Sequence, residues 1–256
     1  MNYFVTLFVL LFLVGCTDSS TPTDTGIDIA VVSPEEHLAQ AISNMKEWTS
    51  YQSQFSSSSI EHPELDAYSS NSELSYIKEP FQVSKLYKDN YFGGHFECYY
   101  AEGAGFSVKN ELGDQTWTTV NEPVTDNALI HAVADLLQLF VQEQDASTFT
   151  DNSAQLTITD GDFDAIRAAI DKVDELRSKL ATPEAILVNI YDESYEPTDT
   201  YEQIDVTLAF QNREITNYMI TIVRDVGMEE YGPGQLDLSE TFSAVNTLQE
   251  IPAPTN

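Results

Sequence analysis

Basic residues are scarce in this chain. Lysine and arginine together number 11 against 42 aspartates and glutamates, which gives a formal net charge of −31 at pH 7. Binding to a phosphate backbone needs a basic face, so this balance excludes nucleic acid as an expected partner. Because the acidic residues are spread along the whole chain, we expect a surface adapted to high salt or alkaline surroundings rather than a single cation-binding patch.

Cysteines and long apolar runs are also few. The chain has two cysteines, and its longest apolar stretch, YFVTLFVLLFLV over residues 3–14, is shorter than the roughly 20 residues that a bilayer-spanning helix needs. Such a stretch is typical of the apolar region of a secretion signal. It leads into Leu13-Val14-Gly15-Cys16, which resembles the lipobox of bacterial lipoproteins, where the cysteine thiol receives a diacylglycerol.

These features predict three segments. A lipoprotein signal peptide covers residues 1–15, a lipidated Cys16 opens a flexible acidic linker over 16–33, and one domain covers 34–254. The predicted partner is the membrane itself, with the protein held on the extracytoplasmic face of the cell membrane. An ordinary signal peptide, or a short anchor with an incidental cysteine, is the alternative. Lipid on Cys16 leaves Cys98 without an intrachain partner, so we expect Cys98 to be a small buried side chain.

Apolar periodicity predicts a helix, several strands, two helices and several more strands. The predicted helices cover 34–48, 127–143 and 160–180, and the clearest predicted strands cover 76–87, 91–100, 203–210 and 215–224. Ser33 and Thr159 are the predicted helix N-caps, 61–75 is a predicted loop, and Gln211–Glu214 is a predicted hairpin turn. Since strand–helix–strand units do not recur, we expect an α+β fold with an antiparallel, twisted sheet.

Motifs of the common enzyme classes are missing. The chain has no G-x-S-x-G, G-x-x-x-x-G-K-[ST], G-x-G-x-x-G or H-E-x-x-H, and its four histidines lie far apart, so we expect neither an enzyme nor a cofactor. Asp160, Asp162 and Asp164 have the spacing of an EF-hand loop, but Ala165 stands where that loop needs glycine. We therefore predict a helix cap there and no metal site.

Four stretches carry a resemblance to a known family. They are AQAISNMKEWTSYQSQF, YIKEPFQV, the YYAEGAGF strand pair followed by a tryptophan, and the closing FSAVNTLQEIPAP. Together with the lipobox, they resemble uncharacterised lipoproteins of Gram-positive bacteria whose domain is similar to LolA, LppX and LprG. The resemblance covers about residues 34–254. It implies a strongly curved antiparallel sheet, an incomplete barrel covered by helices, with no catalytic residue. LolA is soluble and cycles between membranes, whereas a chain anchored at Cys16 stays on its bilayer.

The same resemblance implies a ligand, because better-known relatives hold acyl chains between sheet and helices. We expect a lipid or other hydrophobic ligand in such a cavity. The candidate lining residues are Phe92, Phe96, Tyr100, Phe106 and Trp117. A solid core built from these residues is the other reading. It corresponds to the alternative function, a cell-surface interaction or envelope-sensing module without a small-molecule ligand.

Overall fold

The computed structural model describes residues 32–60, 67–90, 95–103, 105–110, 117–120, 128–180, 200–225 and 233–254. Its helices are α1 (Pro34–Met45), α2 (Leu129–Glu143) and α3 (Phe163–Lys179). Its strands are β1 (Ser50–Ile60), β2 (Tyr68–Ile77), β3 (Gln82–Asp89), β4 (His95–Ala101), β5 (Gly105–Asn110), β6 (Thr118–Val120), β7 (Ala146–Phe149), β8 (Ser153–Ile158), β9 (Thr200–Gln211), β10 (Glu214–Asp225) and β11 (Gly234–Ser243).

The described strands form one antiparallel sheet in the order β6-β5-β4-β3-β2-β1-β11-β10-β9-β8-β7. The first and last strands of the chain pair in its middle, from Gln52 opposite Ser243 to Ile60 opposite Gln235. This pairing joins two groups of strands. One group consists of β1 to β6, which precede α2, and the other consists of β7 to β11, most of which follow α3. The order does not return to its start, so the described sheet is open, and the prediction of an antiparallel α+β fold is confirmed.

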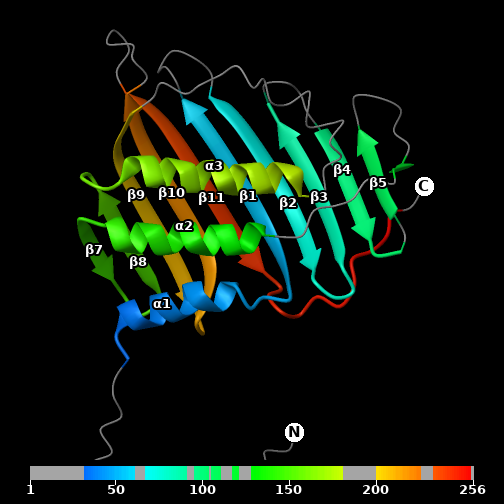
Figure 1. Cartoon of the computed structure of the whole chain (residues 1–256), viewed down its shortest axis with the longest axis horizontal. Helices are drawn as coiled ribbons and strands as arrows, with labels where there is room; N and C mark the ends of the chain where they lie inside the picture. The colour runs from blue at the N-terminus through cyan, green and yellow to red at the C-terminus, as the bar shows by residue number, and fades with distance from the viewer. Residues whose placement is uncertain are drawn as a thin grey trace, which may run out of the picture. The chain divides into compact units, whose positions relative to one another are not determined.

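All three helices lie on one face of the sheet, across the strands from β8 to β2 (Figure 1). Large apolar side chains from β8, β9 and β10 meet the helices there. Ile158, Leu208 and Ile220 are fully buried among them. A smaller cluster of Ile77, Tyr99 and Ile251 is separate from this main core. The segment after β11 reaches it, where the Ile251 amide donates a 2.8 Å hydrogen bond to the side chain of Gln82.

The first helix begins as predicted. The Ser33 hydroxyl accepts a hydrogen bond from the Glu36 amide while the Glu36 carboxylate accepts one from the Ser33 amide, which makes a capping box. The buried face consists of Leu38, Ala41, Ile42 and Met45, which lie at the predicted helical spacing. The helix ends at Met45, three residues before the predicted end at Trp48.

The predicted N-cap of the last helix was wrong. The Asp162 side chain, not that of Thr159, caps α3 by accepting a hydrogen bond from the Ala165 amide, so Asp162 caps a helix and the EF-hand reading has no support here. Thr159 instead donates its amide and its hydroxyl to the Asp145 carboxylate. The sequence alone did not reveal this competing acceptor, which comes from the other side of a short hairpin.

Three strand predictions needed correction. The polar stretch 61–75 was predicted as a loop, but β2 begins at Tyr68 and its serines and Leu74 pair along both neighbouring strands. The predicted strand 76–87 is divided by a turn at Lys78–Phe81, where Pro80 offers no amide to a ladder. The hairpin β7–β8 between α2 and α3 was not predicted at all, because its strands are short and mostly polar.

The hairpin from β9 to β10 agrees with its prediction. Asn212 and Arg213 have φ values of 53° and 64°, the left-handed conformation that a two-residue turn between strands requires. β9 and β10 extend beyond the predicted 203–210 and 215–224, to Thr200 and Asp225. Register shifts at Ile215 and Val223 interrupt their pairing.

Candidate ligand cavity

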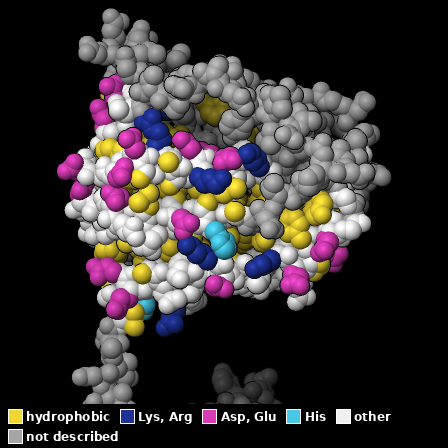
Figure 2. Space-filling view, in the orientation of Figure 1, with side chains coloured by type: hydrophobic (Ala, Val, Ile, Leu, Met, Phe, Trp, Pro, Cys, Tyr) yellow, Lys and Arg dark blue, Asp and Glu magenta, His cyan; other side chains and the backbone are white. Residues whose placement is uncertain are grey.

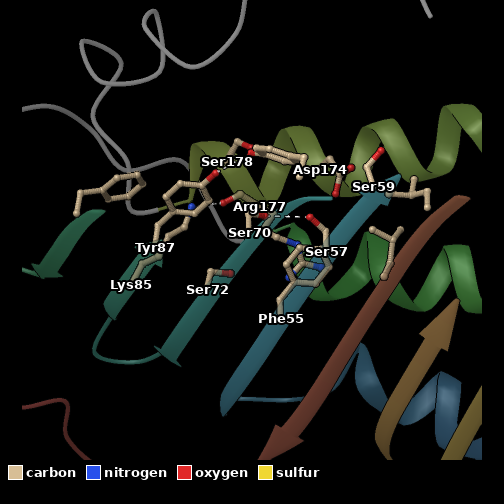
Figure 3. A pocket seen from close by; sticks show the side chains of 14 residues that line it. Phe55, Ser57, Ser59, Ser70, Ser72, Lys85, Tyr87, Asp174, Arg177 and Ser178 are labelled. Carbon is tan, nitrogen blue, oxygen red and sulfur yellow. Dashed lines mark hydrogen bonds between the residues drawn. The ribbon is translucent and has the colours of Figure 1, made fainter. Parts of the chain in front are cut away.

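A cavity of about 310 Å³ lies between the last turns of α3 and the helix-covered face of the sheet. It is lined from α3 by Asp174, Arg177 and Ser178, and from the strands by Phe55, Ser57, Ser59, Tyr68, Ser70, Ser72, Lys85, Tyr87, Phe96, Leu236 and Leu238 (Figure 3). The strands that contribute are β11, β1, β2, β3 and β4. Aromatic and aliphatic walls therefore surround a polar floor, and two basic side chains reach the same space.

Small side chains explain why this part of the interior is open. Ser57 and Ser59 on β1, and Ser70 and Ser72 on β2, occupy positions that alternate toward the helices. The corresponding face of β9 carries side chains as large as Leu208, which fill the layer under α2 and α3. A serine leaves much of that volume empty and presents a hydroxyl. Ser57 and Ser70 are hydrogen-bonded across the two strands at 3.0 Å.

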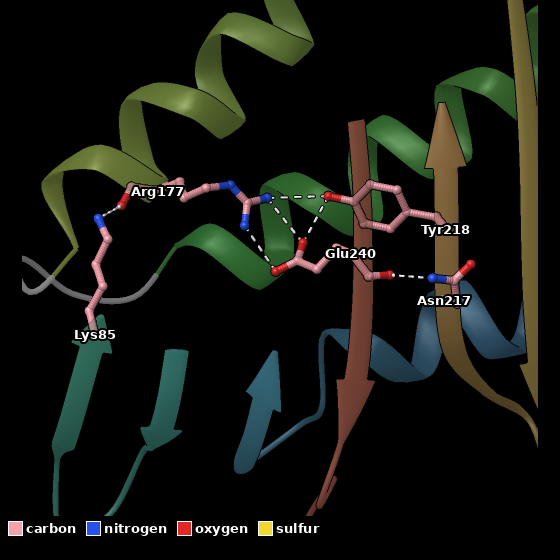
Figure 4. Close-up of polar contacts among 5 residues, drawn as sticks. All are labelled: Lys85, Arg177, Asn217, Tyr218 and Glu240. Atoms are coloured by element: carbon pink, nitrogen blue, oxygen red, sulfur yellow. Dashed lines mark hydrogen bonds and ion pairs between the residues drawn. The ribbon is translucent and has the colours of Figure 1, made fainter. Parts of the chain in front are cut away.

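A buried ionic cluster forms one side of the cavity. Arg177 is 8% exposed and Glu240 1% exposed, and their side chains make two parallel hydrogen bonds of 2.9 and 3.0 Å (Figure 4). Tyr218 donates its hydroxyl to the same carboxylate at 2.8 Å. The ring of Phe55 covers the guanidinium, with 3.7 Å from the guanidinium carbon to the ring centroid. The charge of Arg177 is thus balanced and held in a fixed position.

Burial and pairing act in opposite directions on the pKa values of this cluster. Burial by itself would raise the pKa of Glu240, but the adjacent Arg177 outweighs it and lowers that pKa. Burial would lower the pKa of Arg177, and Glu240 outweighs it in the same way and raises that pKa. Both groups are therefore ionised at neutral pH, and burial raises the pKa of Tyr218 so that its hydroxyl keeps its proton.

Lys85 is the second basic group in the cavity. Its side chain projects from β3 and is 4% exposed, and its amine donates a 2.6 Å hydrogen bond to the main-chain carbonyl of Arg177 in the last turn of α3 (Figure 4). The partial negative charge at a helix C-terminus favours a cation at this position. Burial lowers the pKa of Lys85 to about 7, and the positive charge of Arg177 acts in the same direction. The amine therefore titrates near neutral pH.

Two further groups complete the electrostatics. Asp174, one turn before Arg177 on α3, has a pKa that burial raises to about 6 against the lowering effect of Arg177. Cys98 pairs with Lys85 across β3 and β4, and burial raises the pKa of its thiol to about 12. Cys98 is accordingly neutral, and its predicted role as a small buried side chain is confirmed.

The residues predicted to line a ligand cavity are not all in one place. Phe96 is buried and lines this cavity, with its ring stacked on Tyr87 at 5.0 Å between centroids. Tyr100, four residues further on the same side of β4, packs on Phe81 instead. Trp117 packs against the separate cluster of Ile77, Tyr99 and Ile251. Phe92 and the side chain of Phe106 lie outside the described residues, as does Cys16.

Most of the residues that line the cavity were not predicted from the sequence, because the prediction named aromatic residues alone. The stronger pattern is the serine alternation in SYQSQFSSSSI and YSSNSELSYI, the sequences of β1 and β2. Serine on the inward side of a strand means a polar interior. The basic residues that meet these serines, Lys85 and Arg177, come from β3 and α3, 92 positions apart in the chain, so no local motif joins them.

The described part of the chain holds neither a metal-binding cluster nor a membrane-spanning helix. Within it, no cluster of three or more His, Cys, Asp or Glu side chains has a geometry suited to a metal ion. None of its helices combines the length and the apolar character that crossing a membrane would require. Acidic side chains are spread over the face seen in Figure 2 rather than gathered in one patch.

Comparison with known proteins finds similarity only among solved structures. No family model matches the chain. No curated protein matches it at a significant level. The lipoprotein LppX of Mycobacterium tuberculosis is similar at 12% identity and a TM-score of 0.36, with 86% of this chain and 98% of LppX covered. A LolA superfamily protein from Nitrosomonas europaea is similar at 10% identity and a TM-score of 0.26, with 86% and 96% covered.

A third structure, a DUF1329 family protein from Desulfovibrio piger, is 8% identical with a TM-score of 0.23, and 81% of this chain and 89% of that one are covered. Similarity at TM-scores this low establishes neither common ancestry nor function. The cavity has to be interpreted from its own geometry.

Proposed function

We propose that this protein is a membrane-tethered, extracytoplasmic binding protein that holds a hydrophobic or amphiphilic ligand in the cavity beneath α3. The observation that carries the proposal is the cavity itself, about 310 Å³ in volume and lined by both apolar and hydrogen-bonding side chains. This combination is characteristic of small-molecule sites, where apolar walls supply affinity and a few polar groups fix orientation.

The tether in this proposal is Cys16. A diacylated cysteine carries two chains, and stable attachment takes at least two because each buried CH₂ contributes only about 0.8 kcal/mol. The segment TDSSTPTDTG that follows has no large apolar side chain, which suits a spacer. Metabolic labelling with a palmitate analogue should mark the wild-type chain, and a Cys16→Ser variant should be unmarked and leave the membrane fraction. Labelling that persists in the variant would refute this anchor.

The ligand is tested by native mass spectrometry of the full chain carrying Cys16→Ser, purified from its own host. We expect a bound small molecule near one copy per chain. Ser72→Phe should abolish it by filling the cavity, since Ser72 is buried in the lining. Ser75→Phe is the matched control, because Ser75 lies on the same strand and faces away from the helices. Consistently empty wild-type protein would refute the binding function.

The alternative, an interaction module with a filled core, has less support. A filled module that docks on partners would present a contiguous apolar patch. In the described part of the chain the exposed large apolar side chains are Val32, which precedes α1, and Met219, on the uncovered face of β10. These two residues do not form a patch.

A further inference from the structure

The wall that α3 gives to the cavity carries a carboxyl group without a hydrogen-bond partner among the described residues. Asp174 is one of the lining residues and lies one helical turn before Arg177 (Figure 3). Burial and the charges of Arg177, Asp171 and Glu240 shift its pKa, and no hydrogen bond from the described residues contributes to the shift. Burying a polar group without a hydrogen bond is unfavourable. The Asp174 carboxyl is therefore an acceptor that the described part of the chain leaves for a ligand.

A hydroxyl donor lies at the same end of the cavity. The Ser59 hydroxyl, on β1, accepts a 2.7 Å hydrogen bond from a terminal nitrogen of Arg224. Because a hydroxyl has one proton as well as two lone pairs, the proton of Ser59 stays available to the cavity, which Ser59 lines. Asp174 and Arg224 both act on the pKa of Tyr201, which places these two charged groups in one neighbourhood. Figure 3 shows Ser59 and Asp174 on the side of the cavity away from Lys85.

Serine hydroxyls continue along the floor of the cavity. Ser57 and Ser70 share one hydrogen bond of 3.0 Å, which uses the proton of one hydroxyl and leaves the proton of the other. Both residues line the cavity, as does Ser72. The floor thus offers uncharged groups, each able to donate and to accept a hydrogen bond.

An acceptor beside a donor selects among head groups. An ammonium donates hydrogen bonds and accepts none, so it leaves the Ser59 proton unmatched and adds a third positive charge to those of Arg177 and Arg224. A carboxylate or phosphate is repelled by Asp174, whose pKa of about 6 makes it negatively charged at pH 7.5. A hydroxyl both donates and accepts, so a pair of hydroxyls can donate to Asp174 and accept from Ser59.

We propose that the ligand of this cavity is an uncharged single-chain amphiphile whose head group carries neighbouring hydroxyls, which donate to the Asp174 carboxylate and accept from the Ser59 hydroxyl. Glycerol and sugar head groups share this chemistry. The inference rests on the proposed function, since it concerns the same cavity. Phe55, Leu236 and Leu238 supply an apolar wall for the chain. The volume of about 310 Å³ is at the lower end of the range for ligand sites, which suits one acyl chain and not two or three.

The test uses isothermal titration calorimetry at pH 7.5 on the full chain carrying Cys16→Ser. Two probes carry hydroxylated heads, monooctanoylglycerol and octyl glucoside. The others are methyl octanoate, octanoate and octyltrimethylammonium, and each probe is used below its micelle-forming concentration. We expect at least one hydroxylated probe to bind about tenfold or more tightly than methyl octanoate, because hydrogen bonds to a charged group are the stronger ones. The same probe should also bind more tightly than octanoate and octyltrimethylammonium.

Variants test the contact with Asp174. Asp174→Leu keeps a side chain of similar size and removes the acceptor, so it should weaken binding of the hydroxylated probe about tenfold and leave methyl octanoate unchanged. Asp164→Leu is the matched control, because Asp164 is exposed on the same helix and its substitution should affect neither probe. The comparison of probes is made without either substitution, so the inference is tested even if Asp174→Leu does not fold.

The outcomes distinguish this inference from the proposed function. Equal affinity for the hydroxylated probes and methyl octanoate, or tighter binding of either charged probe, would overturn the hydroxylated head group while leaving an amphiphilic ligand in place. An equal loss of both kinds of probe in Asp174→Leu would overturn the contact between Asp174 and the head group.

Failure of all five probes would overturn the inference, and together with empty protein in native mass spectrometry it would overturn the proposed function as well. Tighter binding of octyl glucoside identifies a sugar head, and tighter binding of monooctanoylglycerol identifies a glycerol head. Either of these two results supports the inference.

Discussion

Arg177 connects α3 to the sheet through a buried ionic cluster. Burying its guanidinium costs several kcal/mol of desolvation, and the paired carboxylate of Glu240 with the Tyr218 hydroxyl offsets that cost. The cluster joins α3 to β10 and β11, so it fixes the height of the helix above the serine-lined part of the sheet. Because α3 is held at this height, the space above the small serine side chains stays open.

Removing one partner of this pair should be far more damaging than removing both. We expect Glu240→Gln to lower the free energy of unfolding by about 3–5 kcal/mol, because it leaves a buried guanidinium without its counter-charge. The double variant Arg177→Met/Glu240→Met should recover most of that loss. Urea denaturation followed by circular dichroism measures all three proteins. A double variant as unstable as Glu240→Gln would contradict this account.

Lys85 should make stability depend on pH in a window set by its two pKa values. The pKa is about 7 in the folded protein and 10.5 in the unfolded chain, so between these values the unfolded chain binds more protons. The contribution of Lys85 to stability therefore rises with pH in that window. Relative to Lys85→Met, wild-type protein should gain about 3–4 kcal/mol between pH 7 and pH 10. If the free energies of unfolding of the two proteins change by the same amount between pH 7 and pH 10, the pKa of Lys85 is not lowered in the folded protein.

At the level of elements, apolar periodicity in the sequence predicted the helices and strands that bury one apolar face. The three helices were found this way, since Leu38, Ile130 and Ile166 belong to stripes that bury against the sheet. β2 was missed because its inward positions include Ser70 and Ser72, which are buried without being apolar. A strand with polar side chains on both faces has no alternation to detect, and only its neighbours identify it as a strand.

At the junction of α2, β8 and α3, Gly161 lies too close to its neighbours to carry a Cβ atom without a shift. A Cβ atom on Gly161 would lie 2.6 Å from the Ile158 Cγ2 atom, and Ile158 is fully buried and has no room to move. Gly161→Ala should therefore cost about 1–3 kcal/mol through overpacking. Asp160→Ala, at the adjacent exposed residue, is the control and should change stability by about 0.5 kcal/mol or less. Similar thermal stability of the two variants would rule out this constraint.

For the whole molecule, the charge of −31 is the dominant property. Self-repulsion destabilises a compact chain of one sign, and salt reduces it because the Debye length falls from about 10 Å at 0.1 M to about 3 Å at 1 M. We expect the thermal midpoint to rise steadily from low salt to 1 M NaCl. Differential scanning fluorimetry of the Cys16→Ser chain measures this. A midpoint independent of salt would refute adaptation to high salt.

The two basic side chains of the cavity are notable against this background. Only 11 lysines and arginines are available to the chain, yet Lys85 and Arg177 are both buried at one site. Placing scarce cations where desolvation is costly opposes stability, so stability alone does not account for them.

The features of this fold that depend on neighbouring residues were predictable before the structure was known. The sequence predicted the three helices, the Ser33 cap, the β9–β10 turn and the antiparallel α+β class, because capping, turn conformation and apolar periodicity are properties of neighbouring residues. Lipidation of Cys16 stays a prediction from its motif. The cavity was not predictable in this way, because its serines, Lys85 and Arg177 are brought together by pairing of β1 with β11 and by the path of α3. Contacts between residues that distant in the chain leave no local pattern in the sequence.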